Sequence, residues 1–129
     1  MAIPFSRVQD YLNAIADAAT LDASNAGHDR FWNGKYADFI GGTVPTKICN
    51  GQQVPIIDPV SKVQSAFFQI LKAQWCGMPQ MPKKGPYATA TGQTFTVTDS
   101  KTGAQTNVTG DKILADIEDW LKNGALENG

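Results

Sequence analysis

Hydrophobic residues at helical spacing predict the first helix of the chain. They recur every three or four positions, at Val8, Leu12, Ile15 and Ala19. This spacing places them on one face of an α-helix. Ser6 precedes the pattern and is a favourable N-cap. Because residues 22–27 have loop composition, we expect the helix to end near Thr20.

A second amphipathic pattern follows Asp58. This acid is a favourable N-cap, and Pro59 suits the first helical position. The apolar positions of the pattern are Val60, Val63, Phe67, Ile70 and Leu71. We expect a helix that starts at Asp58 and runs to Gln74 or Trp75, before the prolines of the loop that follows.

A third pattern predicts a helix near the end of the sequence, starting near Asp111. Its buried face is expected to consist of Ile113, Leu114, Ile117, Trp120 and Leu121. Gly124 follows the pattern and is a typical helix stop.

The segments between these helices have weaker patterns. Aromatic residues within residues 29–40 indicate a short helix that Gly41 and Gly42 end. Residues 43–57 are interpreted as an irregular connection because they contain two prolines and a glycine. Residues 94–98 and 105–109 alternate around a short glycine-containing loop, which predicts a β-hairpin.

Together the patterns predict an all-α, helix-dominated fold for residues 1–129 as a single domain. Three main helices and the short aromatic helix form its body, and the small β-hairpin is inserted before the last helix. A chain of 129 residues suits one domain and needs neither a disulfide nor a metal to hold a core. The hairpin cannot form a core alone.

Composition and charge exclude several classes of protein. The formal net charge is −1, and basic residues form no stripe, so nucleic acid is a poor candidate partner. Lys83 and Lys84 are interpreted as a short solvated basic step. No apolar stretch is long enough to span a membrane, and the start has no signal-peptide pattern. We therefore expect a cytoplasmic protein, or a periplasmic or secreted one if the sequence is a mature form.

Cys49 and Cys76 leave two alternatives open. In a reducing compartment they are expected to be free, buried thiols. In an exported protein a bridge between them is the default expectation.

The order of these features resembles a class I cytochrome c domain. The run from Ile117 to Ala125, Ile-Glu-Asp-Trp-Leu-Lys-Asn-Gly-Ala, is similar to the closing pattern of that family. The stretch Asp58-Pro59-Val60-Ser61, followed by a helix and by Met78-Pro79 or Met81-Pro82, is similar to the middle of bacterial members. The resemblance covers most of the chain and implies a fold of helices around a cofactor cleft.

The chain lacks the family's haem-attachment motif. Covalent attachment needs Cys-x-x-Cys-His, and the sequence has Ala23-Ser24-Asn25-Ala26-Gly27-His28 where the motif would fall. The resemblance therefore implies a haem-free descendant, with a cleft that is filled by a partner or by Trp32, Phe39 and Phe67. A non-covalent haem held by His28 and Met78 or Met81 is the alternative. In the principal interpretation His28 is a loop residue, and the protein has no cofactor.

A metal site is a further alternative. Cys76, Met78 and Met81 place three soft sulfur ligands within six residues, and Cys49 or His28 could add a fourth ligand. Soft ligands select Cu(I). Plain packing by flexible methionines remains the competing interpretation.

Aromatic residues are the candidates for partner binding. Those expected at a contact surface are Phe31, Trp32, Tyr36, Trp75 and Tyr87. Exposed aromatic side chains contribute strongly to interfaces, although such clusters are more often core.

These observations lead to a non-catalytic interaction or accessory protein on a haem-free, cytochrome c-like scaffold. No nucleophile, phosphate-binding loop or carboxylate pair carries a catalytic motif, so we lean against an enzyme. The expected partner is another protein, either a larger redox-enzyme subunit or a second copy of the chain. A copper-binding or electron-transfer protein and a small subunit of a redox enzyme are the alternatives.

Overall fold

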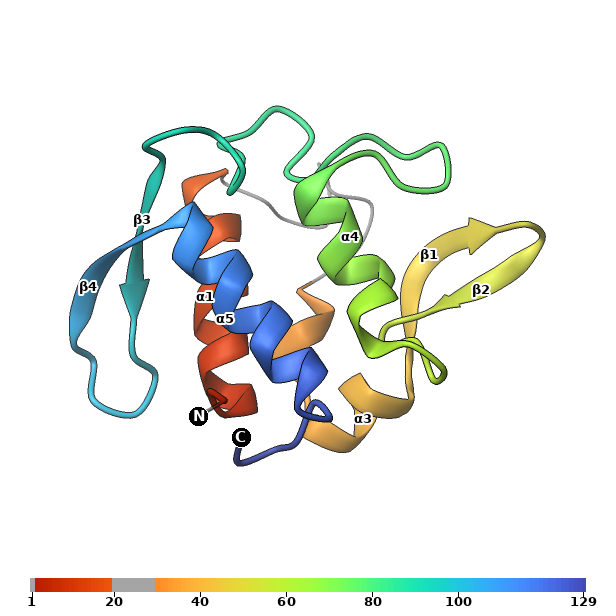
Figure 1. The fold of residues 1–129 in the computed structure, drawn as a ribbon, viewed down its shortest axis with the longest axis horizontal. Helices are drawn as coiled ribbons and strands as arrows, with labels where there is room; N and C mark the ends of the chain where they lie inside the picture. Colours follow the sequence, from red (N-terminus) through yellow and green to blue (C-terminus); the bar gives the residue numbers. More distant parts are fainter. Residues whose placement is uncertain (1, 20–29) are drawn as a thin grey trace.

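The computed structural model describes residues 2–19 and 30–129, and it combines helices with two β-hairpins (Figure 1). Helix accounts for 39% and strand for 19% of the structure, so the expectation of an all-α fold is wrong. The difference arises mainly in residues 43–55, which form a second hairpin instead of an irregular connection.

Helices α1 (Phe5–Ala18) and α5 (Gly110–Lys122) lie side by side at the centre of the fold (Figure 1). The buried surface of α1 includes Val8, Leu12 and Ile15 of the predicted stripe and is wider than predicted, and on α5 the predicted face is buried except for Leu114, which is half-buried. The buried apolar residues of the two helices are Phe5, Val8, Tyr11, Leu12, Ala14, Ile15, Ala16, Ile113, Ile117, Trp120 and Leu121. Pro4 occupies the N-cap position of α1, so Ser6 lies inside the helix and is not its cap.

The end of α5 agrees with the sequence. Gly124 has a φ of 99°, and the Ala125 N–H donates to the Trp120 carbonyl at 2.9 Å. This hydrogen bond is typical of a helix that ends in a left-handed turn. At the other end of α5, the Thr109 hydroxyl caps the helix by accepting from the Lys112 N–H at 3.2 Å.

The predicted hairpin before α5 is confirmed, with β3 at Thr94–Thr98 and β4 at Gln105–Thr109. The strands pair antiparallel, with Thr94 opposite Thr109. Phe95, Val97 and Val108 are buried, and β3 packs against α1. The hairpin is therefore part of the core layer and covers one side of α1 (Figure 1).

The unexpected hairpin consists of β1 (Thr43–Cys49) and β2 (Gln52–Pro55). Asn50 and Gly51 connect the strands with φ angles of 54° and 77°, the positive values that a tight two-residue hairpin turn requires. The Asn-Gly pair was the sequence signal for this hairpin. The two prolines of the segment argued against strands, because proline is rare inside a sheet. They are tolerated here because the sheet has only two strands and its register is irregular between Thr43 and Ile48.

The aromatic segment is broken into two short pieces. The structure has a 3-10 turn, η1 (Phe31–Asn33), and a helix, α3 (Tyr36–Gly41), where one helix from 29 to 40 was expected. Gly34 and Lys35 between them are extended. Position 29 lies outside the described residues.

Helix α4 (Ala66–Lys72) begins later than predicted. The carboxylate of Asp58 accepts from the Val60 and Ser61 N–H groups at 2.9 Å, which closes a turn instead of starting a helix. A 3-10 turn, η2 (Lys62–Gln64), then precedes α4. Val60, expected on the buried face, is 95% exposed as a result.

Aromatic rings join the elements into one core. The ring of Phe39 in α3 lies 5.1 Å from that of Phe5 and 5.3 Å from that of Phe67. Trp120 is fully buried, and its indole N–H donates to the Leu126 carbonyl at 2.8 Å. The Phe5 N–H donates to the Glu127 carbonyl at 2.9 Å, which brings the two ends of the chain together (Figure 1).

Candidate functional site

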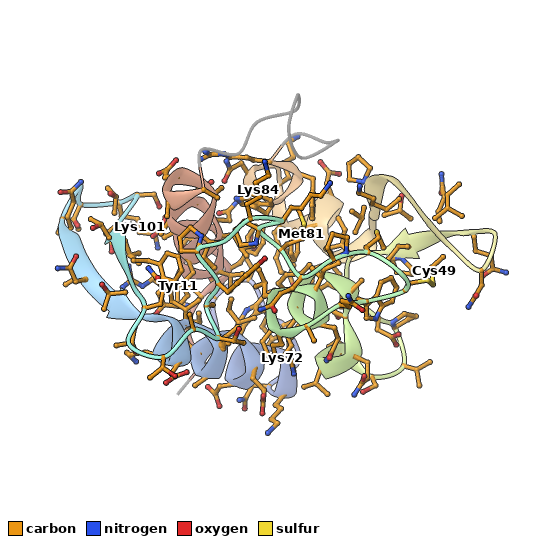
Figure 2. The ribbon with its side chains drawn as sticks, turned by 90° about the horizontal axis from the view of Figure 1, so that it is seen from above. Tyr11, Cys49, Lys72, Met81, Lys84 and Lys101 are labelled. Carbon is orange, nitrogen blue, oxygen red and sulfur yellow. A yellow bond between two sulfur atoms is a disulfide. The ribbon has the colours of Figure 1, made fainter. Side chains whose placement is uncertain are left out.

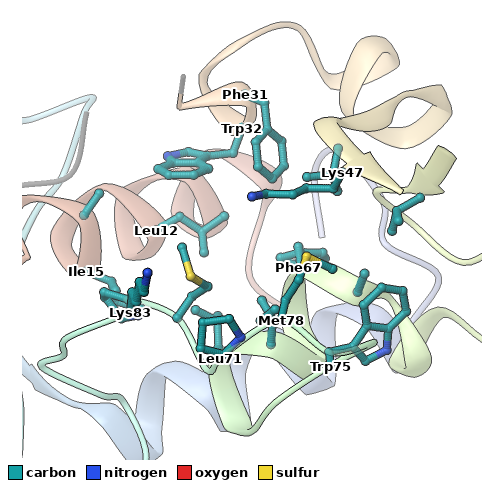
Figure 3. A pocket seen from close by; sticks show the side chains of 18 residues that line it. Leu12, Ile15, Phe31, Trp32, Lys47, Phe67, Leu71, Trp75, Met78 and Lys83 are labelled. Carbon is teal, nitrogen blue, oxygen red and sulfur yellow. The ribbon is translucent and has the colours of Figure 1, made fainter. Parts of the chain in front are cut away.

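A cavity of about 370 Å³ opens between α1, η1, the β1–β2 hairpin, α4 and the loop that follows α4 (Figure 3). Sixteen of its 18 lining residues are apolar, and the other two are lysines, Lys47 and Lys83. Ligand-binding sites are typically concave and apolar with few polar groups. We name this feature the apolar cavity and treat it as the candidate site.

Two helices form the opposing walls of the apolar cavity. Leu12 and Ile15 extend from α1, and Phe67 and Leu71 extend from α4 (Figure 3). These side chains lie on the apolar faces of their helices. They face each other across the cavity.

Trp32 forms part of the cavity beside α1. Its indole N–H donates to Asn13 Oδ1 at 2.8 Å, and its carbonyl accepts from Gln9 Nε2 at 2.8 Å. Both partners lie on α1. The ring is therefore held in one orientation at the cavity wall (Figure 3).

A disulfide between Cys49 and Cys76 joins two tight turns beside the apolar cavity (Figure 2). Cys49 precedes the Asn50–Gly51 turn of the hairpin. Cys76 belongs to a second turn with Gly77, closed by hydrogen bonds of 2.9 and 3.0 Å between the backbones of Trp75 and Met78. The expectation of free, buried thiols is wrong, because the two Cα atoms lie 6.1 Å apart and the sulfurs are bonded.

The loop after α4 is fixed to that helix by hydrogen bonds to the helix's backbone carbonyls. The Met81 N–H donates to the Ile70 carbonyl at 2.9 Å, and Gln80 Nε2 donates to the Leu71 carbonyl at 3.0 Å. Met78 and Met81 are half-buried and line the apolar cavity. The loop thus supplies one wall of the site.

Three of the five aromatic residues predicted for partner binding converge on the cavity. Phe31, Trp32 and Trp75 line it. Tyr36 lies elsewhere, where its ring packs 5.5 Å from that of Phe5 and its hydroxyl donates to the Ala125 carbonyl at 2.7 Å. Tyr87 donates to the Lys83 carbonyl at 2.9 Å and does not line the cavity.

The residues predicted as metal ligands are partly brought together. Met78 and Met81 share the cavity, and the sulfur of Cys76 is bonded to Cys49. His28 lies outside the described residues. Within residues 2–19 and 30–129, no cluster of three or more His, Cys, Asp or Glu has the arrangement of a metal site. The copper site stays a prediction.

The two cavity lysines were missed as site residues. Lys47 lies on β1, in the segment interpreted as irregular, and the Asn50–Gly51 signal could have placed it on a strand. Lys83 was interpreted, together with Lys84, as a short basic stretch exposed to solvent. Within the part of the chain that the structure describes, no carboxylate lies within ion-pair distance of either ammonium group.

Among the described residues, the cavity lining offers apolar side chains and two lysine ammonium groups, and it contains no hydroxyl, carboxylate, thiol or imidazole group. No described helix is long and apolar enough to cross a membrane.

The resemblance to cytochrome c stays a prediction. Comparison with protein-family models, curated proteins and solved structures gives no match to this chain.

Proposed function

We propose that this protein is a non-catalytic binding protein that holds a small apolar molecule in the apolar cavity. The observation that carries the proposal is the cavity itself. Its volume of about 370 Å³ falls within the range of roughly 300–1,000 Å³ for small-molecule sites, and 16 of its 18 lining residues are apolar. Transfer of apolar ligand surface from water into this space drives binding.

The cavity also supports the accessory role expected from the sequence. A haem-free scaffold was expected to fill its cleft with Trp32, Phe39 and Phe67, or with a partner. Phe39 packs in the core, whereas Trp32 and Phe67 line the cavity without filling it. The remaining space is available to an occupant.

The disulfide supports a location in an oxidising compartment. Disulfides persist in secreted and periplasmic proteins and are rare in the cytosol of most organisms. The bond between Cys49 and Cys76 therefore favours the mature, exported form among the two locations considered from the sequence.

Titration with 1-aminoanthracene, an uncharged apolar dye, tests the proposal. We expect its fluorescence to rise on binding and tryptophan emission to be quenched, because Trp32 and Trp75 line the cavity. The double variant Val44→Phe/Ile70→Phe adds volume at two half-buried lining positions. It should weaken dye binding at least about fivefold, since the added rings occupy the space of the dye.

Leu114→Phe is the matched control. Leu114 is half-buried on α5 and packs against the core, away from the cavity lining. Circular dichroism of all variants checks that they fold. Equal dye affinity in the cavity-filled double variant and the wild type would contradict the proposal, as would the absence of dye binding.

A reproducible Soret band in protein from a haem-replete host would contradict the haem-free scaffold.

Copper binding is a second candidate, supported by the position of Met78 and Met81 on the same cavity. Two thioethers form a soft ligand pair that suits Cu(I). Metal analysis of protein purified without chelators tests it. If Met78→Ala/Met81→Ala leaves the bound copper unchanged, the methionines are not its ligands.

A further inference from the structure

We propose that the occupant of the apolar cavity is an amphipathic carboxylate, a molecule with an apolar body and one anionic head that Lys47 binds and that Lys83 attracts from across the cavity. This inference rests on the proposed function, because it assumes that the cavity takes a small ligand. It adds the charge and the polarity pattern of that ligand.

Lys47 carries the first part of the argument. It extends from β1, is half-buried, and its ammonium group points into the cavity between Phe31 and Phe67 (Figure 3). An ammonium group among apolar side chains loses part of its hydration and is stabilised by an anion that replaces it. No described carboxylate lies within ion-pair distance of this group. The positive charge of Lys47 therefore has no described carboxylate to balance it in the cavity.

Lys83 lies on the opposite side of the cavity, near Ile15 (Figure 3). Its backbone is held in place because its carbonyl accepts from the Tyr87 hydroxyl at 2.9 Å. The side chain is exposed, so its head group lies toward solvent. An anionic head near the opening of the cavity is then attracted by two ammonium groups that come from different segments of the chain.

The rest of the lining determines the sign and the shape of the ligand. It contains no acidic residue among those that the structure describes, although the chain as a whole has a net charge of −1. The positive charge is therefore a local property of this site and favours an anion over a cation. The other lining groups are apolar, so the anionic charge must be confined to one end of the ligand.

The choice of a carboxylate follows from the amount of charge present. Lys47 is half-buried and Lys83 is exposed, so one ammonium group is partly enclosed by the described lining, which contains no arginine. A singly charged, compact head matches this set. The apolar body then extends past Leu12, Phe67 and Leu71.

Calorimetric titration with three ligands of the same chain length tests the inference. Dodecanoate, dodecanol and dodecylammonium differ in their head groups. At low ionic strength we expect dodecanoate to bind about tenfold more tightly than dodecanol, a difference that added salt reduces, and dodecylammonium to bind most weakly. Lys47→Met/Lys83→Met should abolish the preference for dodecanoate, so that dodecanoate no longer binds more tightly than dodecanol to this variant.

Lys84→Met is the matched control, because Lys84 is the exposed neighbour of Lys83 and does not line the cavity. It should retain the preference for dodecanoate. If dodecanol binds as tightly as dodecanoate, or if the double lysine variant keeps the preference, the inference fails while the proposed function stands. If 1-aminoanthracene binds and none of the three alkyl ligands does, the inference fails and the proposed function again stands. If no apolar ligand binds, both proposals fail.

Discussion

The hydroxyl of Tyr11 donates a hydrogen bond to a carboxylate oxygen of Asp116, which joins α1 to α5 across 105 positions of the chain. Tyr11 is 1% exposed and lies in the interior in Figure 2. Asp116 also forms an ion pair with Lys112 at 3.1 Å. The contact is thus a polar link between the two central helices.

Tyr11→Phe should lower the free energy of unfolding by about 1–3 kcal/mol, because it removes the donor and leaves the carboxylate short of a partner. Urea unfolding followed by circular dichroism measures the difference. Tyr87→Phe is the control, since its hydroxyl bond to the Lys83 carbonyl is exposed. A loss in Tyr87→Phe as large as that in Tyr11→Phe would show that burial of the hydroxyl bond is not what matters.

The same residue predicts a dependence of stability on alkaline pH. Burial, and then the hydrogen bond and charge of Asp116, raise the pKa of Tyr11 from 10.0 to about 12. A raised folded-state pKa stabilises the fold fully below pH 10, and this contribution is lost as the pH rises toward 12. The difference in unfolding free energy between wild type and Tyr11→Phe should therefore shrink over that interval. A constant difference would contradict the assignment.

Reduction of the disulfide should destabilise the protein. The bond between Cys49 and Cys76 closes a loop with a sequence separation of 27, and loss of this restraint on the unfolded chain costs about 3–4 kcal/mol in the chain-entropy model. Urea unfolding with and without a reductant measures the effect. Cys49→Ser/Cys76→Ser is the control, because its stability should match that of the reduced protein and should not respond to reductant.

Gly110→Ala should destabilise the protein by more than about 2 kcal/mol, although alanine is the better helix former. A Cβ atom at this first residue of α5 would lie 2.0 Å from the Ala88 carbonyl oxygen, so backbone must move. Gly41→Ala is the matched control at the end of α3, where a Cβ meets nothing within 4 Å. Thermal unfolding should show a large loss for the first variant and no loss for the second.

Ser65→Ala should cost about 1–3 kcal/mol of stability. Ser65 is fully buried, and its hydroxyl accepts from the Asp58 N–H at 2.9 Å and donates to the Lys62 carbonyl at 2.6 Å. Removal of the hydroxyl leaves both backbone groups without this partner. The exposed Ser100 provides the control, and a Ser100→Ala change should lie within about 0.5 kcal/mol of wild type.

Local patterns predicted the elements whose signals are contained in one segment. The β3–β4 hairpin was predicted with its bounds, because alternating residues flank a short glycine loop. Helix α5 was also predicted, since its apolar stripe is uninterrupted up to Gly124. Helix α4 was predicted to start too early, because Asp58 can cap either a helix or a turn, and contact with Ser65 decides between them.

The candidate site was harder to predict because it depends on contacts between distant segments. Phe31, Trp32 and Trp75 were selected as aromatic candidates, yet nothing local indicates that they share a cavity. Lys47 was missed, since its position follows from the pairing of β1 with β2 and from the bond between Cys49 and Cys76. The fold thus positions the site through pairings that periodicity does not encode.

The hydrogen bond between Phe5 and Glu127 places the beginning and the end of the described chain next to each other. A short peptide linker could therefore connect them without crossing the core, and the chain could be reopened at the exposed Gly103 turn between β3 and β4. In such a circular permutant β4 and α5 would come first in the sequence and β3 last, while every contact around the apolar cavity would be retained.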